Sequence, residues 1–342
     1  MLTAPRPPLH PRNGATFMAL APKKNKLSLW QRIRQNSLAY KFIAPTFVAM
    51  MIVHLIPIVQ GLYLSLLDVR LTTLTLYLKA PFVGLKYYIE VFNAIFGIGE
   101  AGASSRVTGL INAASNTLVY TIWTNIGTLG LGLILAMLLN REFRWRGIAR
   151  TLVLLPWVVP TFVTGTIFNF IWLEQGGLAN KILLGLNIVD TPVTWLIGPN
   201  SLYALVIATV WRGLPFTTIM FLAAIQVIPT DLYEAASLDG ANGWQRFRHI
   251  TLPLIKPIAG TQVLFGLING FYGGYNIAVQ MFGGGTGFAG EYADLLVPAI
   301  TRQTWERHLY GFGSAASVIL MGMLLVFVGI WYRAFRDSLR AE

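Results

Sequence analysis

The sequence predicts an all-α polytopic membrane protein with six transmembrane helices, on the evidence of its composition and its long apolar runs. Hydrophobic residues make up 55% of the 342 residues and charged residues only 12%, unlike the average soluble protein. Apolar runs long enough to cross a hydrocarbon layer of about 30 Å recur along the chain. The predicted spans are Phe42–Leu67, Ala113–Leu139, Thr151–Leu173, Ser201–Val227, Pro257–Phe282 and Tyr310–Tyr332.

These spans are expected to be helices and not the strands of a membrane barrel. Lipid offers no hydrogen-bond partner to an open backbone, so a spanning segment must satisfy its own peptide groups. Strands of a barrel alternate apolar and polar residues over about ten positions. The run LGLILAMLL in the second span is instead apolar on every face, which indicates a helix.

The positive charges predict the orientation of the chain. Eighteen of the 26 Lys and Arg residues flank the spans on the side that includes the N-terminus, and seven flank the opposite side. Because basic residues accumulate on the cytoplasmic side, both termini are expected in the cytoplasm. This distribution accounts for the net charge of +12, and no nucleic-acid partner is expected, because no basic patch interleaved with aromatic residues is present besides it.

No catalytic or metal-binding pattern is visible in the sequence. The chain has no cysteine, its four histidines are scattered, and it lacks a GxxxxGK[ST] loop for nucleotides. We therefore expect no enzyme activity, cofactor or metal on this chain. An autonomous secondary transporter or channel is the alternative class, but intramembrane carboxylates or an inverted repeat would favour it, and neither is visible.

The spans divide the chain into segments of different composition. Residues 1–41 form a basic N-terminal segment, in which KLSLWQRIRQNSLAYKF is either an interfacial amphipathic helix or a basic tail that sets orientation. Residues 42–111 hold the first span and an external loop containing the amphipathic stretch PFVGLKYYIEVF. Residues 336–342 form a short cytoplasmic tail.

A polar island interrupts the apolar runs between the fourth and fifth spans, within residues 229–256. Pro229 ends the fourth span, and Thr230 or Asp231 is expected to cap a new short helix. Gly240 is expected to adopt the positive φ that ends this helix, and Gly243 to begin a second one. The island is thus predicted to be a helix-turn-helix knob that fits a cleft on a soluble subunit.

Three short motifs in this island resemble the EAA loop of ABC importer permeases: Glu234-Ala235-Ala236, Asp239-Gly240-Ala241 and Ile250-Thr251-Leu252-Pro253. The resemblance extends over residues 112–335. Gly283–Gly285 also resembles the GGGP element of the first permease of carbohydrate-uptake systems, similar to those for maltose, trehalose and glycerol phosphate, although Thr286 stands where proline is usual.

The resemblance implies a type I ABC importer permease fold in a bacterial inner membrane. It implies a heterodimer with a second permease subunit, two ATPase subunits that bind ATP and Mg, and an external solute-binding protein that delivers a sugar-like solute. Within the island, it implies an ATPase-docking surface formed by Glu234, Ala235, Ala236, Asp239 and Gly240.

The residues that line the path of the solute are predicted on the fourth and fifth spans. Asn269, Tyr272, Tyr275 and Asn276 make the fifth span too polar to face lipid, and aromatic rings and amides are the groups that recognise sugars. Arg212 is the one Lys or Arg inside a predicted span, so it should face protein or water. Packing between helices by small and polar residues is the alternative for both features.

Overall fold

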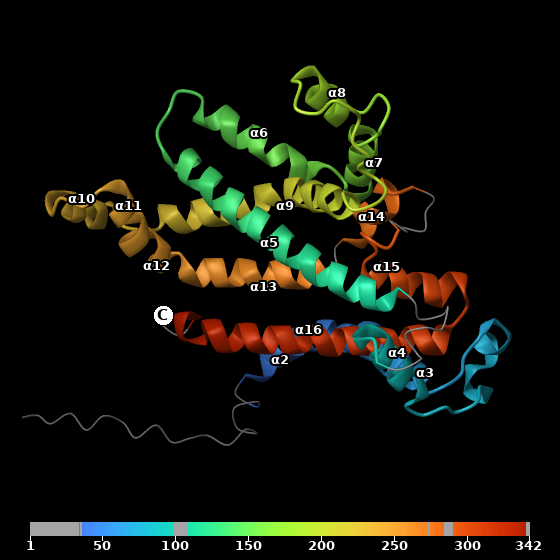
Figure 1. Ribbon diagram of the computed structural model, residues 1–342. Helices are drawn as coiled ribbons and strands as arrows, with labels where there is room; N and C mark the ends of the chain where they lie inside the picture. Colours follow the sequence, from blue (N-terminus) through green and yellow to red (C-terminus); the bar gives the residue numbers. More distant parts are fainter. Residues whose placement is uncertain (1–33, 35, 99–108, 273, 284–289, 340–342) are drawn as a thin grey trace, which may run out of the picture. The chain divides into compact units, whose positions relative to one another are not determined.

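The computed structural model describes residues 34, 36–98, 109–272, 274–283 and 290–339. These residues form helices joined by turns and loops, and Leu67 and Phe82 form an isolated antiparallel bridge (Figure 1). The expected all-α chain is confirmed. The chain divides into two compact units, Met1–Ile58 and Val59–Glu342, which are described separately. The possible amphipathic helix of the N-terminal segment lies mostly outside the described residues.

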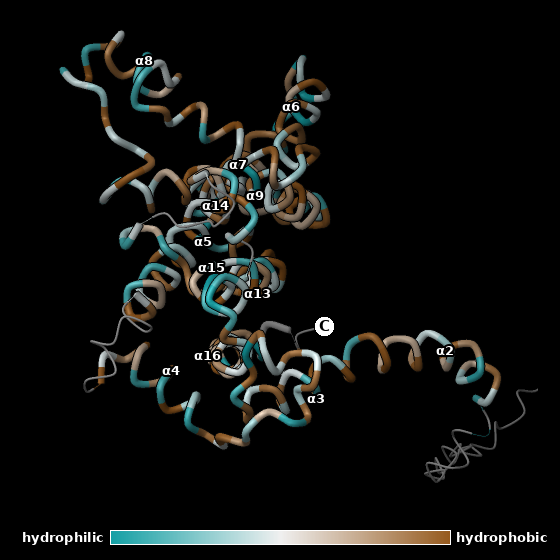
Figure 2. The backbone as a smooth tube through the Cα atoms, turned by 90° about the vertical axis from the view of Figure 1, so that its right-hand side faces the viewer, coloured by the Kyte–Doolittle hydropathy of each residue, from teal (hydrophilic) through white to brown (hydrophobic). Residues whose placement is uncertain are grey.

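The described part of the first unit belongs to the first span. α2 (Ser37–Met50), the π-helical η1 (Met51–Leu55) and α3 (Ile56–Leu64) follow one another directly, and α3 continues into the second unit. Together they form one candidate span in which no residue of the most apolar window is buried. Figure 2 shows hydrophobic residues over most of α2, as expected of a helix surrounded by lipid.

Three further predicted spans are single helices: α5 (Leu110–Asn140), α9 (Ser201–Gln226) and α16 (Tyr310–Leu339). With the first span, they make four helices in the described residues that are long and apolar enough to cross a membrane. The number rises to six if each of two bent helix pairs counts as one span.

The predicted third span is one of the bent pairs. It consists of α6 (Arg146–Val158) and α7 (Thr161–Ile171), which meet at 97°. The break follows from Pro160, because a proline disfavours helical backbone in the residue before it. Val159 accordingly has extended backbone, with φ −65° and ψ 126°.

The predicted fifth span is also interrupted. α13 (Lys256–Tyr272) ends where the continuous helix was expected to go on, and the short α14 (Tyr275–Met281) follows it. At its other end, α13 meets the preceding helical stretch Gly243–Leu254 at 67°. The remaining helices are η2 (Leu71–Lys79), α4 (Lys86–Phe96), α8 (Leu178–Gly185), α10 (Thr230–Leu238), α11 (Gly243–Arg246), η4 (Phe247–Thr251), α12 (Leu252–Leu254), α15 (Leu296–Thr301) and η5 (Arg302–Glu306).

The second unit is organised around α5, which packs against both α9 and α13 (Figure 1). Glycines allow α13 to approach closely. A Cβ atom added to Gly270 would lie 2.5 Å from Thr121 Oγ1 and Cγ2, and one added to Gly266 would overlap the Asn125 amide. The side chains of α5 therefore occupy the space that larger residues on α13 would fill.

The segment between the first span and α5 folds back on itself. The bridge between Leu67 and Phe82 encloses η2. The Tyr87 hydroxyl of α4 donates a hydrogen bond of 2.5 Å to Asp68 Oδ1, and Arg70 Nε donates one of 3.0 Å to the same oxygen. Asp68 therefore joins the end of the first span to α4.

These hydrogen bonds set the protonation of both partners. Burial alone would raise the pKa of Asp68, but the hydrogen bonds from Arg70 and Tyr87 outweigh it and hold the pKa below its usual value. Burial, reinforced by the hydrogen bond to Asp68, raises the pKa of Tyr87 to about 12. At neutral pH the pair is therefore an Asp68 carboxylate that accepts a hydrogen bond from the neutral phenol of Tyr87.

Acid is expected to loosen this segment. A carboxylate with a lowered pKa in the folded state stabilises the fold above the ordinary pKa of aspartate, and this contribution is lost as the pH falls through the lowered value. Cleavage within residues 68–98 by an acid-stable protease should accelerate at low pH in the wild type. The variant Asp68→Asn should be cleaved readily at every pH, whereas Asp190→Asn, which changes an exposed carboxylate in another loop, should resemble the wild type. A wild-type cleavage rate that does not depend on pH would contradict this role of Asp68.

Candidate functional site

A cavity of about 520 Å³ lies in the second unit, where α5, α9 and α13 meet the α6–α7 bend and α14. Polar residues from all of these helices except α6 line it, and aromatic residues complete the wall. The polar residues are Tyr120, Thr124, Asn125, Thr128, Thr161, Thr209, Arg212, Thr217, Gln262, Asn269 and Asn276, and the large aromatic residues among the rest are Trp157, Phe216 and Phe265.

Three of the five residues predicted along the solute path line this cavity: Arg212, Asn269 and Asn276. Tyr272 and Tyr275 do not, and the Tyr272 side chain is 71% exposed. The reason is the interruption of the fifth span. Tyr272 is the last residue of α13, and α14 begins at Tyr275, so the helical periodicity that includes Asn269 ends before Tyr275.

The contribution of α5 was not predicted. Tyr120, Thr124, Asn125 and Thr128 recur at helical spacing and line the cavity from this one helix. The Thr124 and Thr128 hydroxyls each donate 2.7 Å hydrogen bonds to the carbonyl four residues earlier, so they are tolerated in an apolar helix and keep lone pairs that can accept from a ligand. The available signal was the spacing of these polar residues within the second span.

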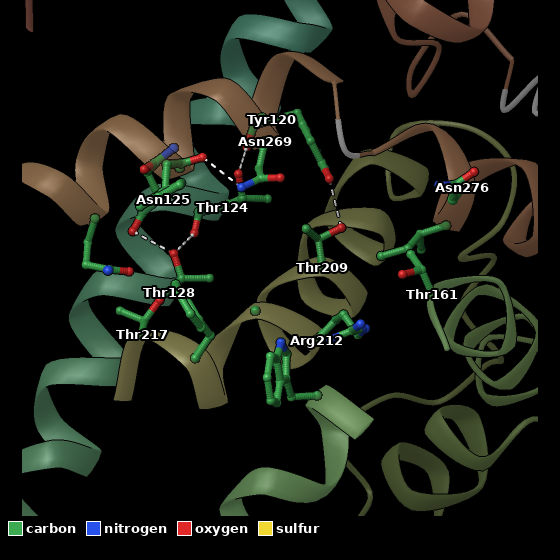
Figure 3. Close-up of a pocket in the computed structure, with 18 residues that line it drawn as sticks. Tyr120, Thr124, Asn125, Thr128, Thr161, Thr209, Arg212, Thr217, Asn269 and Asn276 are labelled. Carbon is green, nitrogen blue, oxygen red and sulfur yellow. Dashed lines mark hydrogen bonds between the residues drawn. The ribbon is translucent and has the colours of Figure 1, made fainter. Parts of the chain in front are cut away.

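Figure 3 shows how these groups are arranged. Thr124, Asn125, Thr128 and Asn269 form one group, and Arg212, Thr161 and Asn276 lie on the other side of the view. Between them, the Tyr120 hydroxyl lies 2.9 Å from Thr209 Oγ1, at hydrogen-bonding distance. The two groups border a space in which a solute can meet polar atoms from several helices.

Several polar atoms of the cavity lining are buried without a hydrogen-bond partner among the described residues. They are Asn125 Oδ1, an acceptor, and two donors, Arg212 Nε and Gln262 Nε2. Leaving such an atom unpaired costs about 1–3 kcal/mol. Three of them around one cavity indicate a place for water or for a ligand that carries both donors and acceptors.

Aromatic rings form one wall of the same cavity. The ring centroids of Phe216 lie 6.3 Å from Trp157 and 6.4 Å from Phe265. Arg212 is the one charged residue in the lining, and no carboxylate belongs to it. In the described part of the chain, no three His, Cys, Asp or Glu residues are placed to hold a metal ion. The lining therefore combines hydrogen-bond donors and acceptors with aromatic rings and a single cationic group.

The island forms the predicted pair of helices, α10 and α11. Gly240 has φ +81°, which confirms its role in ending α10. The Asn242 side chain accepts a 2.9 Å hydrogen bond from Gln245 N, and Gln245 Oε1 accepts one of 2.7 Å from Asn242 N, a capping box that begins α11. The expected cap of α10 is wrong: Pro229 occupies the N-cap position, and Thr230 already lies inside the helix.

The two sides of the island are held together by hydrogen bonds. The Tyr233 hydroxyl lies 2.9 Å from Thr251 Oγ1, and Arg246 Nη1 donates to Ser237 Oγ over 2.9 Å. Glu234, Ala235 and Asp239 are exposed on α10 and at its end, and Ala236 is half-buried. The predicted docking residues therefore lie together on a preformed projection.

A bundle of apolar helices around a polar cavity, with a compact polar projection, defines a membrane transport subunit. The chain belongs to the family described as "Binding-protein-dependent transport system inner membrane component", which matches residues 128–341. The chain is accordingly the permease subunit of an ABC importer and not an enzyme, as its resemblance to such permeases implied.

Relatives of similar length support this assignment. The trehalose/maltose transport system permease protein MalF of Thermococcus litoralis is 34% identical, and the match covers 91% of this chain and 98% of the relative. The sulfoquinovosyl glycerol transport system permease protein SmoG of Agrobacterium fabrum is 29% identical, and the match covers 90% of this chain and 94% of the relative.

A solved structure shares the fold. The crystal structure of a bacterial ABC transporter involved in the import of the acidic polysaccharide alginate contains a chain that matches with a TM-score of 0.73 at 23% identity. The match covers 90% of this chain and 98% of that one. At this identity the comparison shows the fold alone.

Proposed function

We propose that this permease carries a sugar or a related polyhydroxylated solute through the cavity between α5, α9 and α13. The observation that supports this most directly is the set of unpartnered donors and acceptors in a lining that is otherwise aromatic or neutral. A hydroxylated ring can satisfy such atoms, because each hydroxyl both donates and accepts, while its apolar face packs against aromatic side chains.

The names of relatives agree with this solute class. Relatives of this chain are permeases for trehalose and maltose, for sulfoquinovosyl glycerol and for arabinooligosaccharides. Asn269 and Asn276 are proposed to hydrogen-bond the solute from α13 and α14, and Arg212 to set the polarity of the cavity from α9. Tyr272 and Tyr275 lie outside the lining, so the proposed contact is restricted to the other three predicted residues.

The rest of the importer is proposed around this subunit. A second permease would complete a heterodimer, an external solute-binding protein would deliver the solute, and two ATPase subunits with ATP and Mg would drive alternating access. α10 would dock on an ATPase through Glu234, Ala235, Ala236, Asp239 and Gly240. In this arrangement each bent helix pair crosses the membrane as one span, so the chain has six spans. Both termini then lie in the cytoplasm of a bacterial cell.

Alanine at Asn269 or Asn276 tests the proposed cavity contacts. Loss of one hydrogen bond to the solute should cost about 1–2 kcal/mol, which corresponds to roughly a 5–30-fold loss of uptake. Uptake is measured in proteoliposomes that contain the whole complex, with a sugar selected from a panel of labelled mono- and disaccharides.

The matched control is Tyr272→Ala, which truncates an exposed side chain on the same helix outside the cavity. It should assemble and transport like the wild type. If Asn269→Ala and Asn276→Ala assembled normally and also transported like the wild type, the solute would not contact this cavity as proposed.

A further inference from the structure

The helix α4 carries three faces of different character. Tyr87, Val91, Ala94 and Ile95 are buried and belong to a hydrophobic core shared with α5, α15 and α16. A second face is polar and follows Lys86, whose ammonium lies 4.0 Å from Glu90 Oε1. The third face is apolar, like the first, but it is exposed.

This third face consists of large side chains at helical spacing. Leu85, Ile89, Phe92 and Phe96 recur every three or four residues, so they share one side of the helix. They are 63%, 60%, 48% and 55% exposed, and the rings of Phe92 and Phe96 lie 4.6 Å apart. With Phe82, which is 71% exposed, they form what is called here the uncovered apolar face. Soluble surfaces rarely expose so many large apolar side chains together.

Backbone hydrogen bonds fix this face close to the end of the first span. Leu66 O accepts from Val83 N at 2.9 Å and from Gly84 N at 3.1 Å, and the helix of the first span ends at Leu64. The beginning of α4 is therefore attached two residues beyond a membrane-spanning helix. Tyr63, in the last turn of that helix, is itself 41% exposed, so large exposed side chains are present at this end of the span as well as on α4.

We propose that the uncovered apolar face of α4 lies against phospholipid, in the boundary between the headgroups and the acyl chains. The order of the three faces fits this environment. The buried face and the uncovered face point in nearly opposite directions, and the polar face with Lys86 and Glu90 lies between them. A helix placed beside the bundle at the membrane surface needs protein on one side, lipid on the other and water above.

Lipid fits this face better than a protein partner does. Protein interfaces combine an apolar centre with polar groups that form hydrogen bonds, whereas the five residues of the uncovered apolar face carry no polar side-chain atom. The nearest charged group on α4, the Lys86 ammonium, stands on a flexible stem that reaches toward the phosphates while its methylene groups stay in the boundary. The amphipathic stretch that the sequence showed in this loop is thus an interfacial helix with two apolar faces.

Cysteine scanning tests the location directly, because the natural chain contains no cysteine. The variants Ile89→Cys and Phe92→Cys place a thiol on the uncovered apolar face, and Lys86→Cys places one on the polar face of the same helix. Each is labelled with a small thiol-reactive fluorophore in the whole complex. The complex is then reconstituted in vesicles of phosphatidylethanolamine and phosphatidylglycerol.

Two quenchers distinguish the environments. A nitroxide attached high on the lipid acyl chain should quench the labels at positions 89 and 92 several-fold more than the label at position 86, and aqueous iodide should show the opposite order. Iodide quenching at 89 and 92 as strong as at 86 would place the face in water and overturn the proposal. Protection from both quenchers would place it under another protein subunit, and protection that appears only on addition of the solute-binding protein would assign it to that protein. Either result also overturns the lipid contact.

Discussion

Replacing Gly270 by valine is expected to prevent assembly of a stable transport subunit. A Cβ atom at this position would lie 2.5 Å from two atoms of Thr121 and 2.8 Å from a third. Thr121 cannot move away easily, since it is β-branched and its hydroxyl donates a 2.7 Å hydrogen bond to Thr117 O. Overpacking of this kind costs about 1–3 kcal/mol or more, and here it also separates two walls of the cavity.

The readouts are the melting temperature of the purified complex and its uptake of solute. Gly130→Ala is the matched control, because Gly130 lies in the interior of α5 and a Cβ atom added there meets nothing within 4 Å. That change should be neutral or slightly stabilising, since alanine favours a helix over glycine by about 1 kcal/mol. Normal stability and uptake in Gly270→Val would show that α5 and α13 are not in close contact at this point.

Reversing the charge of Glu234 is expected to abolish the stimulation of ATP hydrolysis by solute. Glu234 is exposed on α10 and makes no hydrogen bond or ion pair with another described residue, so its replacement should leave the fold of the island intact. We expect Glu234 to pair with a basic residue of the ATPase at the proposed docking surface, so Glu234→Lys would place two positive charges together in a contact that excludes water. Breaking such a pair costs several kcal/mol.

Two measurements separate docking from folding for this variant. Co-purification of the ATPase with Glu234→Lys should fall, and the residual complex should show basal but not solute-stimulated hydrolysis. Glu142→Lys makes the same charge change at an exposed position in the loop between α5 and α6 and should behave like the wild type. Full co-purification together with full stimulation of Glu234→Lys would remove Glu234 from the docking surface.

The features predicted best from the sequence are the helix ends that depend only on residues a few positions apart. The left-handed backbone of Gly240 and the start of α11 at Gly243 follow from glycine and asparagine chemistry within a few positions. The first and last residues of a uniformly apolar helix were also predictable: the predicted span Ser201–Val227 corresponds to α9, Ser201–Gln226. The N-cap of α10 was predicted wrongly. Pro229 occupies this position and makes no side-chain hydrogen bond, whereas the prediction assumed a capping side chain from Thr230 or Asp231.

The cavity was only partly predictable because it depends on packing between helices that are distant in sequence. Asn269 and Asn276 stood out as polar residues in an apolar span. Thr124 and Thr128 did not, since threonine is close to neutral in hydropathy and its hydroxyl can bond within its own helix, so an apolar span tolerates it. Gly266 and Gly270 of α13 let Asn125 and Thr121 approach. The sequence shows these glycines, but it does not show which helix they face, so the close contact between α13 and α5 could not be predicted from them.

The bend of 67° between Gly243–Leu254 and α13 connects the island directly to a helix that lines the cavity. Ile255, at the bend, is only 1% exposed and packs in one cluster with Ile228 of the segment leading into α10. α13 runs from this buried pivot, and Asn269 lies about 20 Å along it. A tilt of about 10° at the pivot therefore displaces Asn269 by about 3.5 Å, roughly the length of a hydrogen bond. A small angular movement of the island would thus be enough to make or break the hydrogen bond proposed between Asn269 and the solute.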